Sequence, residues 1–284
     1  MRFLAPIFAL ILPSLASAQS FPDAKAIVSI GGPVTEVVYA LGQESRIVAR
    51  DTTSVFPPQT ADLPDVGYMR QLSAEGVLSV GPDLILTRDT AGPPEVLDQL
   101  RGAAVPIVEV VDAFSPEAVI NAVNTIGTAL DVPAEAEALA TRIQQEFDTL
   151  AEKQAQAPVN TRVLFVLSNK GGRLTVAGRD TGANGIIKLA GGTNAMEDAF
   201  SGYKIMNDEA LISAAPDVIL MMPPTGDHTG DISDVLTLPA ISQTPAGQND
   251  ALVMVDPAAL GFGPRTGQFA TQLYADLRAI TAKD

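Results

Sequence analysis

The side chains best suited to catalysis or metal binding are scarce in this 284-residue chain. The sequence contains no cysteine, which excludes disulfides, iron–sulfur clusters and thiolate metal sites. It contains one histidine, His228, so a zinc site built from several histidines is excluded as well. Neither a Gly-x-Ser-x-Gly nucleophile elbow nor a Gly-x-x-x-x-Gly-Lys phosphate loop occurs. A binding function is therefore favoured, and an α/β enzyme stays a remote alternative.

The N-terminus has the pattern of a secretory signal peptide, predicted over residues 1–18. Arg2 supplies a positive charge, the apolar run Phe3–Leu15 is too short to cross a bilayer, and Ala16–Ala18 matches the small-x-small cleavage signal. Cleavage near Ala18-Gln19 is expected, with a retained anchor as the alternative. The formal charge of −15 disfavours nucleic acid as a partner and direct insertion into anionic membranes. The mature protein is predicted to be free in the periplasm.

Short apolar runs alternate with helical patterns along the chain. Runs such as Leu84–Leu86 and Pro106–Val110 lack polar alternation, which is typical of parallel strands buried on both faces. The same alternation of strand and helix patterns begins again at Arg162–Leu167. These patterns predict an α/β fold with two similar lobes, each a mostly parallel sheet flanked by helices.

The segment between these two parts has a helical periodicity and no strand pattern. Leu139, Ile143 and Phe147 recur at helical spacing and predict one continuous helix over 134–156. At 1.5 Å per residue such a helix is about 35 Å long, the span of a small domain. It either packs inside one domain or connects two lobes, and we favour the second interpretation. The expected units are an N-terminal lobe at 19–132, an interlobe helix at 133–157 and a C-terminal lobe at 158–284.

The two halves of the chain also match each other. Each half contains a Gly-Tyr pair, then a glutamate seven residues before the proline of a Pro-Asp turn, then an aliphatic strand. The matching residues are Gly67-Tyr68, Glu75 and Pro82-Asp83 in the first half and Gly202-Tyr203, Glu209 and Pro216-Asp217 in the second. Two related lobes that face each other across a cleft are suited to trapping a ligand. Loops at the carboxyl ends of parallel strands point into such a crevice, and the segment containing Tyr68 is one of them.

The chain resembles the helical-backbone periplasmic binding proteins of iron-complex and vitamin B12 importers, over essentially its whole mature length. Within that family it is most similar to the haem (hemin) branch. The resemblance is strongest in Gly67-Tyr68-Met69-Arg70-Gln71-Leu72-Ser73-Ala74-Glu75-Gly76, and Thr244–Gly247 and Leu260–Arg265 follow the same pattern. It implies a substrate-binding component of an ABC importer that carries ferric haem to a membrane permease dimer. A ferric-siderophore or cobalamin binding protein of the same fold is the alternative.

The resemblance further implies that Tyr68 is the axial ligand of the haem iron. A phenolate is a hard oxygen donor that suits ferric iron, and tyrosine is an established haem ligand. A free phenol has a pKa of about 10, so its ionisation needs help from the metal and from a nearby cation. Arg70 is expected to donate a hydrogen bond to the phenolate. The alternative is a half-buried loop tyrosine whose hydroxyl bonds the backbone.

Other residues are weaker candidates for the same site. His228, in a loop after Met222, is a candidate second axial ligand or else a solvated loop histidine. Tyr203 is expected to line the cleft without binding iron, because Lys204 follows it where Met-Arg follows Tyr68. The further candidates for contacts with the porphyrin or its propionates are Met69, Arg88, Arg179, Tyr203, Lys204 and Met206.

Glu75 and Glu209 have a separate role in the resembled family, where one surface glutamate from each lobe docks onto the permease. Symmetric carboxylates on symmetric lobes suit a two-fold partner of opposite charge. The alternative is that both residues are acidic side chains at helix starts, where the helix dipole favours them.

Overall fold

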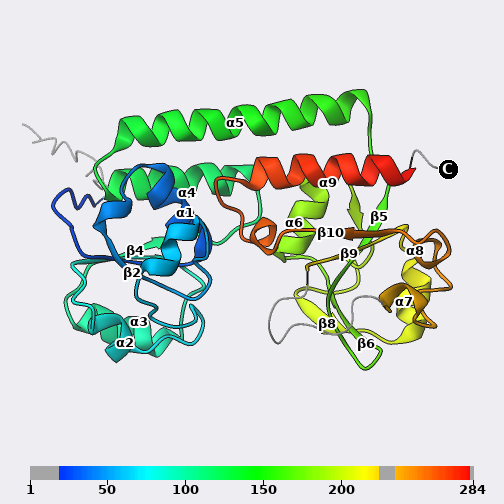
Figure 1. Cartoon of the computed structure of the whole chain (residues 1–284), viewed down its shortest axis with the longest axis horizontal. Helices are drawn as coiled ribbons and strands as arrows, with labels where there is room; N and C mark the ends of the chain where they lie inside the picture. The colour runs from blue at the N-terminus through cyan, green and yellow to red at the C-terminus, as the bar shows by residue number, and fades with distance from the viewer. Residues whose placement is uncertain (1–18, 224–233, 282–284) are drawn as a thin grey trace, which may run out of the picture.

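The computed structural model describes residues 19–223 and 234–281, so the predicted leader and His228 lie outside the described residues. Two α/β lobes lie side by side, and one long helix, α5, runs above both (Figure 1). The helices are α1 (Gly32–Ala40), α2 (Ala74–Leu78), α3 (Pro94–Gly102), α4 (Pro116–Ala129), α5 (Pro133–Gln156), α6 (Gly182–Leu189), α7 (Asp208–Ala214), α8 (Pro245–Gln248) and α9 (Thr266–Thr281). The strands are β1 (Ile27–Ile30), β2 (Ile47–Arg50), β3 (Leu84–Arg88), β4 (Ile107–Val110), β5 (Arg162–Lys170), β6 (Arg173–Ala177), β7 (Thr193–Asn194), β8 (Tyr203–Ile205), β9 (Val218–Met221) and β10 (Leu252–Met254).

The N-terminal sheet is fully parallel, in the order β2-β1-β3-β4. Its central strands are buried on both faces: Ile27 packs in one apolar cluster, whereas its neighbour Val28 packs in another on the opposite face. Burial on both faces explains the unbroken apolar runs, since each side chain meets a core whichever way it points. The predicted fold of this lobe is confirmed.

The C-terminal sheet is mixed. Strands β10, β9 and β5 run parallel, and β6 and β8 continue the sheet in antiparallel fashion, while β7 pairs with β5. The turn between β5 and β6 contains Gly171 and Gly172, both at positive φ, which lets the chain reverse tightly. The lobe thus has the expected parallel part, with an antiparallel extension that the sequence analysis did not predict.

The repeated Pro-Asp turns have the same structural role in both lobes. The Asp83 carboxylate accepts hydrogen bonds from the N–H groups of Lys25 and Ala26 at 2.8 and 2.9 Å, just before β1. The Asp217 carboxylate accepts one from the N–H of Arg162 at 2.7 Å, at the start of β5. Each aspartate therefore fixes the start of a neighbouring parallel strand, which gives the sequence repeat a physical basis.

Helix α5 occupies the predicted position and buries one face. Leu139, Ile143 and Phe147 point into an apolar cluster that continues from Ile27 in the N-terminal lobe to Phe165 in the C-terminal lobe. The helix packs along α4 and α9, so it connects the lobes and also forms part of a shared core. Within the described ranges, none of the helices is long and apolar enough to cross a membrane.

Candidate ligand-binding cleft

Tyr68 projects from a loop that is fixed on both sides. Its neighbours Val66 and Met69 are buried in the N-terminal core, whereas Tyr68 itself is 40% exposed. The backbone is bound to the rest of the lobe, because Thr52 N–H donates to the Gly67 carbonyl at 3.0 Å and Gly92 N–H donates to the Met69 carbonyl at 2.9 Å. The phenol is thus presented by a loop with little freedom, which is what a preorganised ligand site requires.

Arg70 is exposed, and no acidic side chain within residues 19–223 and 234–281 forms an ion pair with it. Its positive charge favours a lower pKa for Tyr203 on the other lobe, against the larger effect of burial. The described contacts include no hydrogen bond between Arg70 and the Tyr68 hydroxyl, so that expected bond stays a prediction. An unpaired guanidinium in a strongly acidic protein is suited to meeting an anionic ligand.

Tyr203 lies at the start of β8, on the C-terminal side of the cleft. Burial raises the pKa of its phenol, while hydrogen bonds with the Thr181 side chain and from the Ala183 N–H, and the charge of Arg70, oppose the rise. The ring meets Phe165 edge to face, with centroids 6.5 Å apart. The phenol is therefore protonated at neutral pH, and the contact with Phe165 holds the ring in place.

The two Gly-Tyr pairs have similar local geometry. Gly67 and Gly202 have φ angles of 99° and 80°, a region that side chains disfavour, and each allows the chain to turn just before its tyrosine. Tyr68 and Tyr203 are both 40% exposed. The internal repeat thus places one half-exposed phenol on each lobe.

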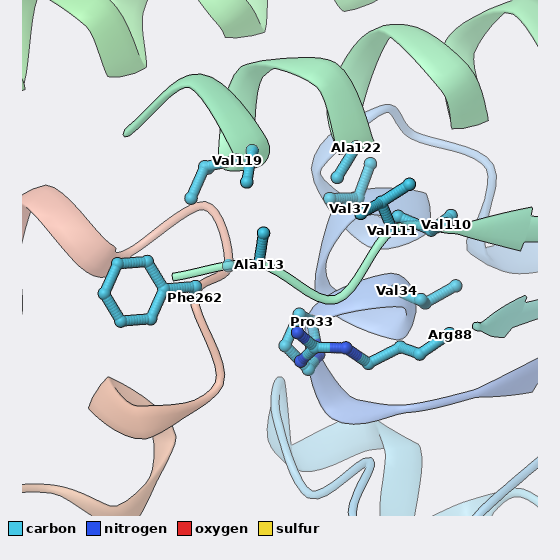
Figure 2. Close-up of a pocket in the computed structure, with 12 residues that line it drawn as sticks. Pro33, Val34, Val37, Arg88, Val110, Val111, Ala113, Val119, Ala122 and Phe262 are labelled. Carbon is cyan, nitrogen blue, oxygen red and sulfur yellow. The ribbon is translucent and has the colours of Figure 1, made fainter. Parts of the chain in front are cut away.

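The N-terminal and C-terminal lobes are in direct contact along a line that we call the seam, and they are closely packed there. Figure 2 shows side chains from both lobes meeting there, with Phe262 approaching Ala113 and Arg88 extending toward Pro33. The remaining cavity of about 10 Å³ is no larger than one water molecule needs. A cavity of this size admits no ligand larger than water.

Arg88 joins the lobes at this seam. Its guanidinium forms an ion pair with Asp112 and donates to the Gly261 carbonyl, in the C-terminal lobe, at 2.6 Å. The side chains of Arg88 and Asp112 are only 8% and 7% exposed. Burial lowers the pKa of Arg88 to about 10, with Arg70 adding to the effect and Asp89 opposing it, so the group stays protonated at neutral pH. These contacts give Arg88 a structural role at the seam, and its expected contact with a propionate stays a prediction.

Arg265 forms a second link across the seam. It donates to both carboxylate oxygens of Glu36 on α1, at 2.9 and 2.7 Å. Its guanidinium also lies 3.6 Å from the ring centroid of Phe56 and 4.9 Å from that of Phe269. Bidentate pairing and stacking hold the segment before α9 against the N-terminal lobe.

A cavity of about 650 Å³ lies between α6 and the loop that enters α4. Asp112, Asp180 and Lys188 are among its lining residues. All three have partners of opposite charge: Lys188 pairs with Glu197 at 2.6 Å, Asp112 pairs with Arg88, and Asp180 lies 3.6 Å from Arg179. The residues that line this cavity do not include Tyr68.

The other expected contact residues differ in their placement. Met69 is 7% exposed and packs in the N-terminal core, and the partly buried Met206 packs against a C-terminal apolar cluster. Neither methionine is placed to offer a broad surface to a ligand. Arg179 is half exposed and lies 3.6 Å from Asp180, whereas the exposed Lys204 lies over the Phe200 ring. Both cations stay available as propionate partners.

Glu75 and Glu209 occupy matching positions. Each is exposed at the second residue of a short helix, α2 or α7. Ser73 caps the first helix by accepting from Gly76 N–H, and Asn207 caps the second by accepting from Ala210 N–H. The same capping therefore presents one carboxylate on each lobe. This placement agrees with docking onto a permease and also with acidic side chains favoured at helix starts.

Two buried polar residues that organise the cleft loops were missed from the sequence. Asp51 accepts hydrogen bonds from the Gly31 N–H and the Ser54 hydroxyl. The Asn194 amide donates to the carbonyls of Ala177 and Gly178, just before α6. The bond between Gly31 and Asp51 and those of Asn194 join residues 16 to 20 positions apart, so no local motif identifies these links.

Two lobes with related loops on either side of a cleft define a ligand-binding protein of the bilobal type. The family model described as "Periplasmic binding protein" matches residues 27–259, and the chain belongs to this family. The match places the chain among substrate-binding proteins and not among enzymes. It also supports an extracytoplasmic location.

Solved structures with similar folds cover nearly the whole chain. The periplasmic heme-binding protein RhuT from Roseiflexus sp. RS-1 is 34% identical, with a TM-score of 0.84 over 90% of this chain and 99% of that one. The periplasmic heme-binding protein BhuT, solved with two hemes, is 36% identical, with a TM-score of 0.85 over 90% and 98% of the two chains. These likenesses confirm the predicted bilobal fold.

Curated relatives are more distant. An uncharacterised ABC transporter substrate-binding lipoprotein of Bacillus subtilis, YvrC, is 27% identical over 70% of this chain, and the match spans 63% of that protein's length. The vitamin B12-binding protein of Pectobacterium carotovorum is 26% identical over 78% of each chain.

Proposed function

We propose that this protein captures ferric haem in the interlobe cleft and delivers it to an ABC importer. The observation that supports this most is Tyr68, a half-exposed phenol on a fixed loop, with the exposed guanidinium of Arg70 two residues away. The phenolate supplies a hard donor to ferric iron, and the guanidinium favours the anionic state of the ligand. The likeness to heme-binding structures at 34–36% identity agrees with this assignment.

The cations around the cleft suit the haem carboxylates. Arg70, Arg179 and Lys204 are exposed, and among carboxylates of the described residues only Asp180 comes close to one of them, 3.6 Å from Arg179. In a protein of formal charge −15, these side chains oppose the field that repels an anionic ligand. Haem is transported cargo in this proposal and not a resident cofactor.

Cobalamin is the second candidate, favoured by the vitamin B12-binding relatives at 26–27% identity. It carries its own axial groups on a bulky, amide-rich macrocycle, and so has no need of a phenolate. The geometry at Tyr68 therefore supports haem over cobalamin.

A titration of the purified mature protein with hemin, and then with cyanocobalamin and a ferric siderophore as competitors, tests the assignment. Saturable binding of hemin with a shifted Soret band, undisturbed by a tenfold excess of either competitor, is the expected result. Displacement of hemin by cobalamin, or absence of a saturable Soret change, would contradict haem as the cargo.

For Glu75 and Glu209, we propose that they dock the loaded protein onto the permease dimer. Reversing both charges, Glu75→Lys and Glu209→Lys, is expected to reduce hemin-stimulated ATPase activity of the reconstituted importer at least tenfold, because carboxylates that meet cations fix the encounter and register. Hemin affinity should stay unchanged, since both residues are exposed on helices outside the cleft loops. The matched control is Glu95→Lys together with Asp276→Lys, which changes the charge equally elsewhere on the two lobes. Equal loss in the control would show a general charge effect and no specific docking.

A further inference from the structure

Strand β8 leaves an apolar face exposed at the edge of the C-terminal sheet. Tyr203 and Ile205 are 40% and 60% exposed, unusual values for large apolar side chains. They are two residues apart on one strand, so their side chains lie on the same face. Lys204, between them, lies on the other face and covers the Phe200 ring.

The contacts of the Tyr203 side chain fix its hydroxyl and its ring in different ways. Its hydroxyl is already engaged by Thr181 and by the Ala183 N–H at the start of α6. Its ring rests edge to face against Phe165. This contact holds the ring in a fixed orientation while the residue stays 40% exposed, so an aromatic surface is presented at the edge of the sheet.

The opposite side of the cleft indicates what meets this face. The charge of Arg70 reaches Tyr203, and Tyr68 lies two residues before Arg70 in the same loop. An aromatic ring and an aliphatic side chain, spaced about 7 Å apart along the strand, suit a flat apolar surface better than a small ion.

We propose that Tyr203 and Ile205 form a platform, the β8 platform, that packs against the flat face of a porphyrin and selects it for its planarity. The inference rests on the proposed haem function and adds a division of labour: Tyr68 binds the metal and the β8 platform binds the ring. It follows that the cleft retains affinity for a porphyrin without iron.

Iron-free protoporphyrin IX is the probe that separates these roles. Its fluorescence reports binding to the mature protein, and wild type is expected to bind it saturably. Tyr68→Phe should retain this binding within about threefold, since no iron is present to be bound. Tyr203→Ala should weaken it about tenfold, by loss of the aromatic contact and the buried area. Tyr203→Phe should stay within about twofold, because the ring and not the hydroxyl makes the contact.

Ile205→Asp provides a second variant at an exposed position whose replacement leaves the core intact, and it should also weaken porphyrin binding about tenfold by placing a charge against an apolar ring. Val55→Asp, at a position in the N-terminal lobe that is 70% exposed, is the matched control and should bind as wild type does.

Unchanged affinity in both Tyr203→Ala and Ile205→Asp would overturn the platform, as would an equal loss in Tyr203→Phe and Tyr203→Ala. If wild type binds hemin but not protoporphyrin IX, the platform is wrong and the haem function stands. If wild type binds neither, the haem function itself fails.

Discussion

Replacing Tyr68 with phenylalanine is expected to remove the tyrosinate signature of bound hemin and to weaken hemin binding at least about 100-fold, equivalent to about 2.8 kcal/mol. The change deletes one oxygen, the proposed donor to ferric iron, and keeps the ring that fills the loop. The fold should be preserved, because Tyr68 is half exposed and its loop is anchored by the backbone of Gly67 and Met69. Absorption spectroscopy of the hemin complex, with a competition assay for affinity, measures both effects.

Tyr39→Phe is the matched control, since Tyr39 lies on α1 outside the cleft loops. It should leave the spectrum and the affinity unchanged. A Tyr68→Phe protein with the wild-type spectrum would contradict the ligand assignment, even if its affinity fell.

Replacing Arg88 with methionine is expected to destabilise the protein by about 3–5 kcal/mol, because it leaves the buried Asp112 without its ionic partner. It also removes the bond to the Gly261 carbonyl, which crosses the seam between the lobes. For a chain of this size the melting temperature should fall by roughly 10 °C. Thermal unfolding followed by circular dichroism measures the change.

Arg101→Met is the control for loss of an arginine that has ionic partners but is exposed to solvent. Arg101 pairs with Asp98 and Glu109 and is 48% exposed, so its removal should hardly alter the melting temperature. The double change Arg88→Met with Asp112→Leu should recover part of the loss, since no buried charge is then left unpaired. Equal melting temperatures for the Arg88 and Arg101 variants would show that the buried Arg88–Asp112 pair contributes no more to stability than an exposed ion pair.

Much of the architecture could be read from local patterns. Unbroken apolar runs such as Leu84–Leu86 identified buried parallel strands, and the spacing of Leu139, Ile143 and Phe147 identified α5. The antiparallel addition of β6 and β8 was missed, because Arg162–Leu167 has the same apolar composition whether its neighbours run parallel or antiparallel. Strand direction is set by connections and not by composition.

The arginines were harder to assign than the strands. Arg88 stands at the end of a strand, where ligand contacts are common, and its partners Asp112 and Gly261 are far away in sequence. A cation that binds a ligand and one that binds a distant carboxylate look alike in a sequence. Met69 raised the same difficulty: its position beside Tyr68 predicted contact with the ligand, whereas the loop turns its side chain into the core. Tyr68 and Arg70 were predicted from a longer string, and the structure adds that the backbone around Tyr68 is held in place and that Arg70 has no ion pair within the described residues.

The apolar cluster that runs from Ile27 through Ile143 to Phe165 has a consequence for how the protein melts and moves. Domains that swing freely meet at small polar interfaces, whereas here the two lobes share closely packed side chains. Neither lobe can unfold without exposing apolar surface of the other, so calorimetry should record a single transition. For the same reason, wide separation of the cleft walls in the isolated protein would require breaking core contacts. The two lobes of the unbound protein are therefore held close to the arrangement described here.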